Sequence, residues 1–191
     1  AACPELDLTG RLGQIEWYES STVAPPSAQA SGHYALALNQ TRLWGATFAA
    51  QVGPEPQLSD RASRQNLAAL EALNPYWRQD SKGADLQARA GVRATTADRL
   101  PLIGGLPDEA ALTADRQMLE RCAWTIDPGA YTRPGIFVAG GFGSRGFTWA
   151  PWAADILTSI IFQDPLPARR EALRMVVPNR QILRKLKRST S

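Results

Sequence analysis

Residues 86–95, LQARAGVRAT, alternate strictly between small or apolar and polar side chains. A period of two is typical of a β-strand that shows different faces to its two sides. The stretch 13–19 alternates in the same way, and residues 33–38 and 41–49 have the composition of two further strands. Asn39-Gln40 between the last two predicts a tight hairpin turn. The first half of the chain therefore predicts a largely antiparallel sheet.

Helical patterns follow these strands without regular βαβ alternation. Ser59 is a candidate N-cap for a helix that ends before Pro75, and residues 147–162 are apolar nearly all round, which predicts a buried helix. Residues 100–108, LPLIGGLPD, predict a turn region, and residues 135–141 predict a short apolar strand that ends in glycines. The order of elements favours an α+β fold.

Length and composition limit the classes of protein. A chain of 191 residues, 44% of them hydrophobic, can form a full domain with a core of its own. No apolar run reaches the roughly 18 residues of a membrane helix, and the first ten residues lack the pattern of a signal peptide. Cys3 and Cys122 are the two cysteines, too few for a disulfide framework. We therefore expect a cytoplasmic protein with reduced thiols and no membrane contact; a Cys3–Cys122 disulfide is the less favoured alternative.

Charge is distributed unevenly. Residues 169–188 contain eight Lys and Arg and a single acid, Glu171, so this tail carries +7. The net charge of the chain is +3, which leaves −4 on the rest. A basic tail on an acidic body indicates an acidic partner, although a solvated terminal helix has the same composition.

The sequence GFGSRG at 141–146 matches G-x-G-x-x-G, the dinucleotide-binding fingerprint. That fingerprint requires a second parallel strand that ends in an acid about 20 residues later. Here Asp164 stands in a proline-flanked turn, so the context argues against a pyrophosphate site. A packing turn is one alternative. The other is close approach to a planar ligand, because glycines expose the backbone and a helix N-terminus favours negative charge.

Two spaced motifs resemble the closing segments of the D-amino-acid oxidase and glycine oxidase (DAO) superfamily. The first is a G-x-R-x-x-T-x-D-x-x-P-x-I-G stretch within residues 91–108, and the second is the strand, glycine loop and helix of residues 135–157. The residues that match the first motif are Gly91, Arg93, Thr96, Asp98, Pro101, Ile103 and Gly104. The resemblance implies an FAD-dependent oxidoreductase.

Within the superfamily, the chain resembles the C-terminal part of the oxidoreductase domain of the bifunctional tRNA 5-methylaminomethyl-2-thiouridine biosynthesis proteins. Residues 91–108, 144–157 and the tail 177–188 carry this resemblance, together with Gly13-Gln14 and the sequence WGATF at 44–48. It implies a substrate-binding domain with a truncated start at 1–134, the last strand, glycine loop and helix of an FAD-binding domain at 135–166, and a basic tail at 167–191. The N-terminal FAD-binding and methyltransferase portions of that family are expected as missing partners, and tRNA is the expected substrate.

The resemblance also implies site residues. Arg93 and Arg145 would bind a substrate carboxylate through guanidinium forks, although strand periodicity alone makes Arg93 a solvated surface residue. The residues expected to contact the flavin are Gly140, Gly141, Phe142, Gly143, Ser144, Arg145, Gly146, Phe147 and Thr148. No catalytic acid or base is required, because the flavin supplies the redox chemistry. His33 lacks partners at metal-ligand spacing, so we expect a structural role and no metal.

The expected reaction is oxidative removal of the carboxymethyl group from 5-carboxymethylaminomethyl-2-thiouridine at the wobble position of tRNA. Two alternatives stay open at this stage. One is a glycine- or sarcosine-type oxidase of free amino acids, and the other is a non-catalytic fragment that binds tRNA through its basic tail. We expect Arg180, Arg184, Lys187 and Arg188 of the tail to contact tRNA phosphates rather than bases.

Overall fold

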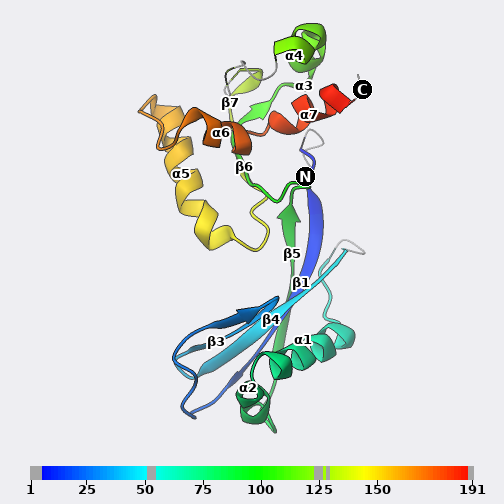
Figure 1. The fold of residues 1–191 in the computed structure, drawn as a ribbon, viewed down its shortest axis with the longest axis vertical. Coiled ribbons are helices and arrows are strands. Elements are labelled where there is room, and N and C mark those ends of the chain that lie inside the picture. Colours follow the sequence, from blue (N-terminus) through cyan, green and yellow to red (C-terminus); the bar gives the residue numbers. More distant parts are fainter. Residues whose placement is uncertain (1–5, 51–54, 123–126, 128–129, 189–191) are drawn as a thin grey trace. The chain divides into compact units, whose positions relative to one another are not determined.

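The computed structural model describes residues 6–50, 55–122, 127 and 130–188, with backbone alone at 46–50, 120–122 and 186–188. The chain forms two compact units (Figure 1). Gly10–Arg93 form the sheet unit, and residues 1–9 with 94–191 form the terminal unit. Each unit is described by itself below.

The sheet unit is built on five strands in the order β2-β3-β4-β1-β5. Their bounds are β1 Thr9–Glu19, β2 Gln29–Ser31, β3 His33–Leu38, β4 Thr41–Ala50 and β5 Gln87–Thr95. The pairs β2–β3, β3–β4 and β1–β4 are antiparallel. The predicted hairpin turn is confirmed: Leu38 pairs with Thr41, and Asn39 has a φ of 55°. The expected α+β class with a largely antiparallel sheet is likewise confirmed.

Two helices, α1 Asp60–Leu73 and α2 Pro75–Asp80, pack on this sheet. The predicted start of α1 is confirmed, because the Ser59 side chain accepts a hydrogen bond from the Ala62 N–H. Helix α2 was not predicted, because Pro75 was interpreted as the residue before which the helical structure ends. Pro75 instead occupies the first turn of α2, where its missing N–H costs nothing, and Asn74 caps that helix by accepting from the Tyr76 N–H at 2.9 Å.

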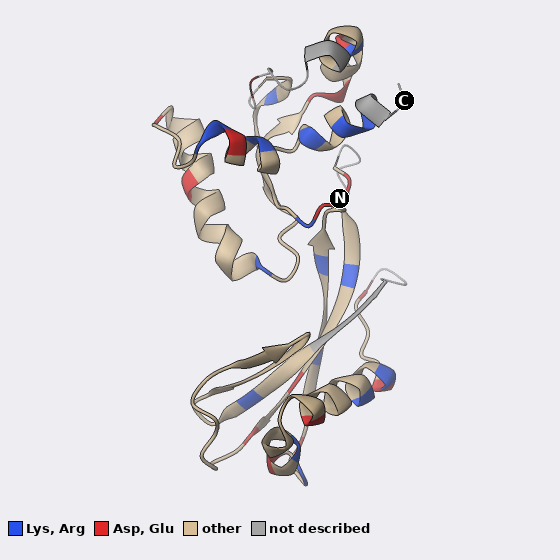
Figure 2. Cartoon of the chain, in the orientation of Figure 1, with Lys and Arg blue, Asp and Glu red and all other residues tan. Residues whose placement is uncertain are grey.

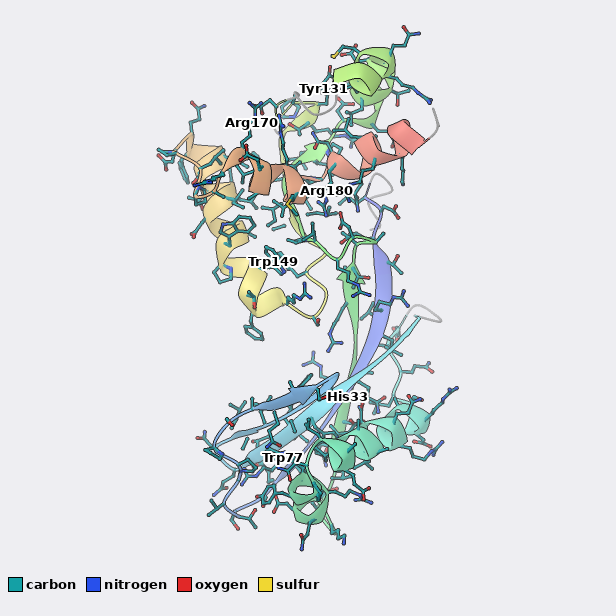
Figure 3. All side chains as sticks on the ribbon, in the orientation of Figure 1. His33, Trp77, Tyr131, Trp149, Arg170 and Arg180 are labelled. Carbon is teal, nitrogen blue, oxygen red and sulfur yellow. The ribbon has the colours of Figure 1, made fainter. Side chains whose placement is uncertain are left out.

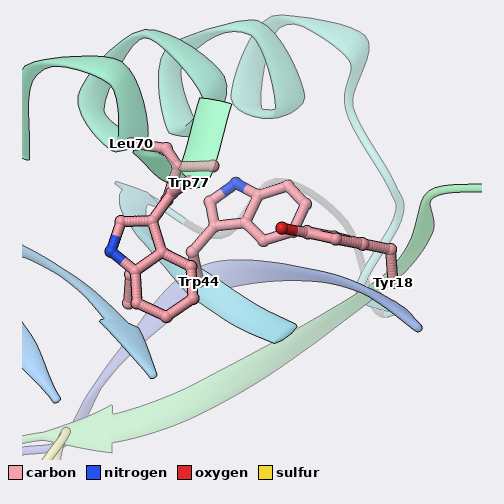
Figure 4. Close-up of a cluster of buried hydrophobic side chains, with 5 residues drawn as sticks. Tyr18, Trp44, Leu70 and Trp77 are labelled. Carbon is pink, nitrogen blue, oxygen red and sulfur yellow. The ribbon is translucent and has the colours of Figure 1, made fainter. Parts of the chain in front are cut away.

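The core of the sheet unit lies between the sheet and these helices. Its buried members are Tyr18, Ala35, Trp44, Leu70 and Trp77 (Figure 4). The rings of Tyr18 and Trp44 meet edge to face, with centroids 5.5 Å apart. The Tyr18 hydroxyl donates to Asp80 at 2.8 Å. Burial and this hydrogen bond raise the pKa of Tyr18 above its ordinary 10.0.

The terminal unit contains a two-stranded antiparallel sheet and five helices in the described part of the chain. Their bounds are β6 Leu102–Pro107, β7 Thr132–Gly140, α3 Glu109–Ala114, α4 Arg116–Cys122, α5 Gly146–Phe162, α6 Arg170–Val176 and α7 Arg180–Arg188. The prediction of a turn region at 100–108 was wrong for most of its length, since β6 lies there. Gly105 does not turn the chain: a methyl group on it would lie 2.7 Å from Cβ of Thr132, so the glycine permits close approach of β7.

Helix α5 has the predicted bounds but not the predicted burial. Among its residues only Ala153 and Ile156 are buried, and they pack with Ile103 of β6 and with α6. At its end Ile161 and Phe162 are 51% and 71% exposed. The expectation of a helix buried on all sides is therefore wrong within this chain, because its second apolar face lacks a covering layer among the described residues.

Among the described residues, no helix has the length and apolar character needed to cross a membrane. Cys3 lies outside the described residues and the side chain of Cys122 is not described, so the expectation of reduced thiols stays a prediction.

Candidate functional site

The two faces of the sheet differ in what covers them. Alternation along β1 directs Gln14, Glu16 and Tyr18 towards the helices: Gln14 donates to Ser63 at 2.8 Å, and Asn66 of α1 donates to Glu16. The intervening residues lie on the opposite face, over which the described part of the sheet unit has no helix. They are Gly13, Ile15 and Trp17 of β1, with Gly45 and Leu43 as their cross-strand neighbours on β4. This open face has half-buried apolar side chains around two glycines.

Arg93 belongs to the open face. It is half-buried, whereas Arg89 on the same strand is exposed. The Arg93 guanidinium packs against Gly13: a methyl group built on Gly13 would lie 2.9 Å from Cζ and closer still to Nη1. Periodicity alone made Arg93 a solvated residue, and the structure instead fixes its charged end beside the backbone of β1. Gly13 is a neighbour that the sequence did not indicate, since its pairing depends on the register of the sheet.

The glycine loop is attached to the end of β5 within the terminal unit. The Gly143 N–H donates to the Ala94 carbonyl at 3.0 Å, and Thr95 forms an isolated bridge with Phe142. Gly141 and Gly143 have φ angles of 69° and 57°, in the region that favours glycine. The loop therefore needs its glycines for a backbone path that other residues adopt only with strain.

The first turn of α5 is exposed and has no side-chain cap. Arg145 is the N-cap residue, and its side chain makes no capping hydrogen bond, so it does not satisfy the first N–H groups of the helix. A methyl group on Gly140 or Gly146 would meet no atom within 4 Å. Phe147 is fully exposed, and Ser144, Arg145 and Thr148 are exposed as well. The start of α5 thus has backbone donors, an exposed aromatic side chain and glycines close together in the chain, which are groups that could hold a flavin ring.

Arg93 and Arg145 belong to different units, so each is characterised by its own surroundings. Arg93 ends the sheet unit, and Arg145 lies in the terminal unit. His33 begins β3 and is half-buried (Figure 3). Among the described residues, no three His, Cys, Asp or Glu side chains form a group that could hold a metal.

Asp98 of the T-x-D motif binds the basic tail. Arg180 donates from Nε and Nη2 to the two Asp98 oxygens, each at 3.0 Å, and from Nη2 to the Leu100 carbonyl at 2.9 Å. Arg184 also pairs with Asp98. Although burial by itself raises the pKa of Asp98, the hydrogen bonds from Arg180 and from the Leu100 N–H hold that pKa well below its usual range. The sequence identified Asp98 as a motif residue and missed its partner 82 positions later.

The tail is thus partly structural. The expectation that Arg180 contacts tRNA phosphates was wrong, because its side chain is 5% exposed and committed to Asp98 (Figure 3). Arg184 and Lys185 stay largely exposed, at 51% and 66%, while pairing with Asp98 and Asp7. Figure 2 marks the Lys and Arg positions of α6 and α7 in blue along the ribbon. The side chains of Lys187 and Arg188 lie outside the described residues.

An apolar groove lies between α5 and the β6–β7 sheet. It encloses about 550 Å³. Its walls include Phe137 of β7 and Ile160 of α5, both 37% exposed, together with Leu166. Ile136 of β7 and Ile161 and Phe162 of α5 are also exposed, although they do not line the groove. An apolar surface of this kind marks a place where another protein segment or ligand binds.

The sequence is similar to a known family and to curated proteins. The family described as "DAO: FAD dependent oxidoreductase" matches residues 11–160. The tRNA 5-methylaminomethyl-2-thiouridine biosynthesis bifunctional protein MnmC of Aromatoleum aromaticum is 36% identical over 181 residues, which are 94% of this chain and 27% of that protein. The protein of the same name from Burkholderia vietnamiensis is 36% identical over 178 residues, 92% of this chain and 27% of that protein. The chain thus spans 27% of the length of these curated relatives.

Solved structures share the fold. The iminodiacetate oxidase of Chelativorans sp. BNC1 is 18% identical with a TM-score of 0.64, over 91% of this chain and 40% of that one. The glycine oxidase of Geobacillus kaustophilus is 18% identical with a TM-score of 0.65, over 86% of this chain and 38% of that one. These likenesses concern the arrangement of the backbone.

Proposed function

Since the chain belongs to the DAO family of FAD-dependent oxidoreductases, we propose that it forms the substrate-binding and ring-facing part of a flavin amine oxidase. The substrate that we propose is tRNA with 5-carboxymethylaminomethyl-2-thiouridine at the wobble position, in keeping with the names of the relatives at 36% identity. The single observation that carries the site is the half-buried Arg93 guanidinium, packed against Gly13 on the open face of the sheet.

In this proposal the flavin ring lies beside the glycine loop and the first turn of α5, residues 140–148. The free N–H groups at the start of this 17-residue helix would stabilise negative charge on a reduced flavin. FAD, when bound, would accept a hydride from the carbon next to the substrate nitrogen and pass its electrons to oxygen. The division of the chain at 134/135 and 166/167 into substrate domain, FAD-domain end and tail is part of this proposal.

The chain itself would contribute position and charge. Arg93 and Arg145 would bind the carboxylate of the glycine-like arm by two-pronged hydrogen bonds, which orients the neighbouring CH₂ group. Loss of hydride from this carbon and of the N–H proton to water gives an imine, and addition of water then releases glyoxylate and leaves the aminomethyl nucleoside. No protein acid or base is needed to break the C–H bond. We therefore assign no catalytic residue in this chain.

The dinucleotide-binding portion of the enzyme is the partner that we propose for the groove between α5 and β6–β7. Exposed Phe137, Ile160 and Phe162 provide its apolar contact. This chain alone should then hold FAD weakly, since the pyrophosphate would bind to the partner portion. The measurement is flavin absorbance after desalting, for this chain alone and for the holoenzyme, meaning this chain together with its dinucleotide-binding portion. A stoichiometric yellow protein from this chain alone would contradict the proposal and favour GFGSRG as a pyrophosphate site.

The substrate is tested by product analysis. The holoenzyme is incubated with the modified tRNA, with glycine and with sarcosine, and glyoxylate and the tRNA nucleosides are quantified. We expect one glyoxylate for each aminomethyl nucleoside formed from tRNA. Turnover of the free amino acids without turnover of tRNA would instead identify an amino-acid oxidase. Tight tRNA binding without any glyoxylate would identify a binding module.

A further inference from the structure

We propose that Gly13 is a positioning residue whose missing side chain creates the space for the Arg93 guanidinium. Gly13 thereby determines where the substrate carboxylate binds. This inference rests on the proposed role of Arg93 and adds to it a residue on a different strand, β1, that the motifs did not connect with Arg93.

The contact is specific to Arg93. The three atoms nearest to a methyl group built on Gly13 are all guanidinium atoms of this one side chain: Nη1, Cζ at 2.9 Å and Nη2 at 3.2 Å. Real Cβ atoms do not approach other heavy atoms to less than 3.0 Å, so a side chain at position 13 would displace the guanidinium. No backbone atom stands among these nearest neighbours.

Other glycines of the sheet differ from Gly13. A methyl group on Gly45 would meet Cγ2 of Ile15 at 2.8 Å and also two backbone atoms, the Gln14 carbonyl oxygen at 3.0 Å and Cα of Ile15 at 3.1 Å, so substitution there would push two strands apart. A methyl group on Gly91, which is on the same strand as Arg93, would meet no atom within 4 Å. Gly45 is therefore required by the backbone, Gly91 tolerates a side chain, and Gly13 leaves room for a functional group.

Substitution of Gly13 by alanine should consequently change the site without unfolding the sheet. Gly13 pairs with Phe48 of β4, before the register shift between Gln14 and Ile15, and has no positive φ angle. Alanine is at least as stable as glycine in a strand interior. The end of a long flexible side chain can move where a backbone cannot, so the displacement would fall on the guanidinium. Two-pronged carboxylate binding depends on the position of that group, and a misplacement of about 1 Å at a site is enough to reduce its function strongly.

The experiment measures binding of glycolate, a small carboxylate without an amine, to the holoenzyme by calorimetry. Glycolamide, its neutral counterpart, reports contacts other than those to the carboxylate. The variants are Gly13→Ala, Arg93→Ala, the double variant, and Gly91→Ala as the matched control. Thermal unfolding of each variant is recorded in parallel, so that a loss of fold is seen separately from a loss of binding.

We expect Gly13→Ala to weaken glycolate binding at least about tenfold, to leave glycolamide binding unchanged and to keep the unfolding temperature. It should add no further loss to Arg93→Ala, and Gly91→Ala should bind as the unchanged protein does. Unchanged glycolate binding in Gly13→Ala, or an additive loss in the double variant, would overturn the role of Gly13. If Arg93→Ala itself binds glycolate normally, the proposed carboxylate site fails first, and the role of Gly13 fails with it.

Discussion

The sheet unit and the terminal unit cover their apolar surfaces differently. In the sheet unit, Trp44 and Trp77 lie 2% and 1% exposed between one face of the sheet and α1–α2. In the terminal unit, β7 and α5 leave Ile136 and Phe162 48% and 71% exposed. Both units pack two of their own helices on a sheet, but the terminal unit leaves large apolar side chains of β7 and α5 exposed beside its buried cluster.

This difference distinguishes apolar residues that are buried in the core of their own unit from apolar residues that stay exposed, although the two kinds look alike in the sequence. Residues 41–49 contribute Trp44 to a closed core. The apolar run at 147–162 instead leaves large side chains exposed at both ends of α5, namely Phe147 at its start and Ile160, Ile161 and Phe162 at its end. Self-contained packing accounts for the sheet unit. In our proposal, the dinucleotide-binding portion completes the packing of the terminal unit.

The largest effect should come from the closed core. Trp77→Ala removes an indole that is 1% exposed and donates to Gln29 at 2.7 Å. We expect a loss of about 3–5 kcal/mol in the free energy of unfolding of the sheet unit. Leu38→Ala, at a side chain 60% exposed, is the control and should change it by less than about 0.5 kcal/mol. Denaturant unfolding measures both, and equal losses would remove the contrast between core and surface in this unit.

In the terminal unit, the ion pair of Arg180 with Asp98 contributes to stability. Arg180→Ala leaves the Asp98 carboxylate without its two-pronged partner, and we expect a loss of about 3 kcal/mol in stability. Arg184→Ala removes a side chain that is 51% exposed, so its loss should stay below about 1 kcal/mol. If both variants unfold at the same denaturant concentration as the unchanged chain, the tail does not stabilise this unit.

The same contact predicts a dependence on acid. The pKa of Asp98 is lower in the folded chain than its ordinary 3.8, so its contribution to stability is fully present above pH 3.8 and is lost as the pH falls further towards the folded value. Stability measured between pH 6 and pH 2 should therefore fall less in Asp98→Asn than in the unchanged chain. Parallel curves for the two proteins would show that Asp98 does not titrate in this range.

The smallest effect on the isolated chain should come from the open apolar surface. Ile160→Asp places a charge on a side chain that lines the groove and is 37% exposed, and we expect a change of less than about 1 kcal/mol in the stability of the chain alone. Association with the dinucleotide-binding portion should nevertheless weaken, because the charge would be buried there. Sedimentation of the mixed portions measures this, with Met175→Asp, 53% exposed on α6 and away from the groove lining, as the control.

Local patterns predicted the local structure well. The hairpin turn at Asn39, the cap at Ser59 and the alternation of β5 depend on neighbours along the chain, and the structure confirms all three. Contacts between distant segments were not predictable in this way. Arg180 meets Asp98 across 82 positions, and Arg93 meets Gly13 through the order of strands in the sheet. The glycines of β6 led to the wrong prediction of a turn, because a residue that permits a turn also permits close approach of two strands.

Anaerobic reduction of the flavin by the modified tRNA tests the proposed function most directly. The holoenzyme is mixed with tRNA in the absence of oxygen, and the loss of flavin absorbance is followed. The proteins compared are the unchanged protein, Arg93→Ala, Arg145→Ala and the control Arg89→Ala. Arg89 is an exposed arginine on the same strand as Arg93. We predict rapid reduction in the unchanged protein and in Arg89→Ala, with transition-state stabilisation lower by about 2–5 kcal/mol in Arg93→Ala and in Arg145→Ala. Equal rates and equal half-saturation in all four proteins would contradict the assignment of Arg93 and Arg145 as carboxylate ligands. An unreduced flavin in the unchanged protein would contradict the proposed reaction itself.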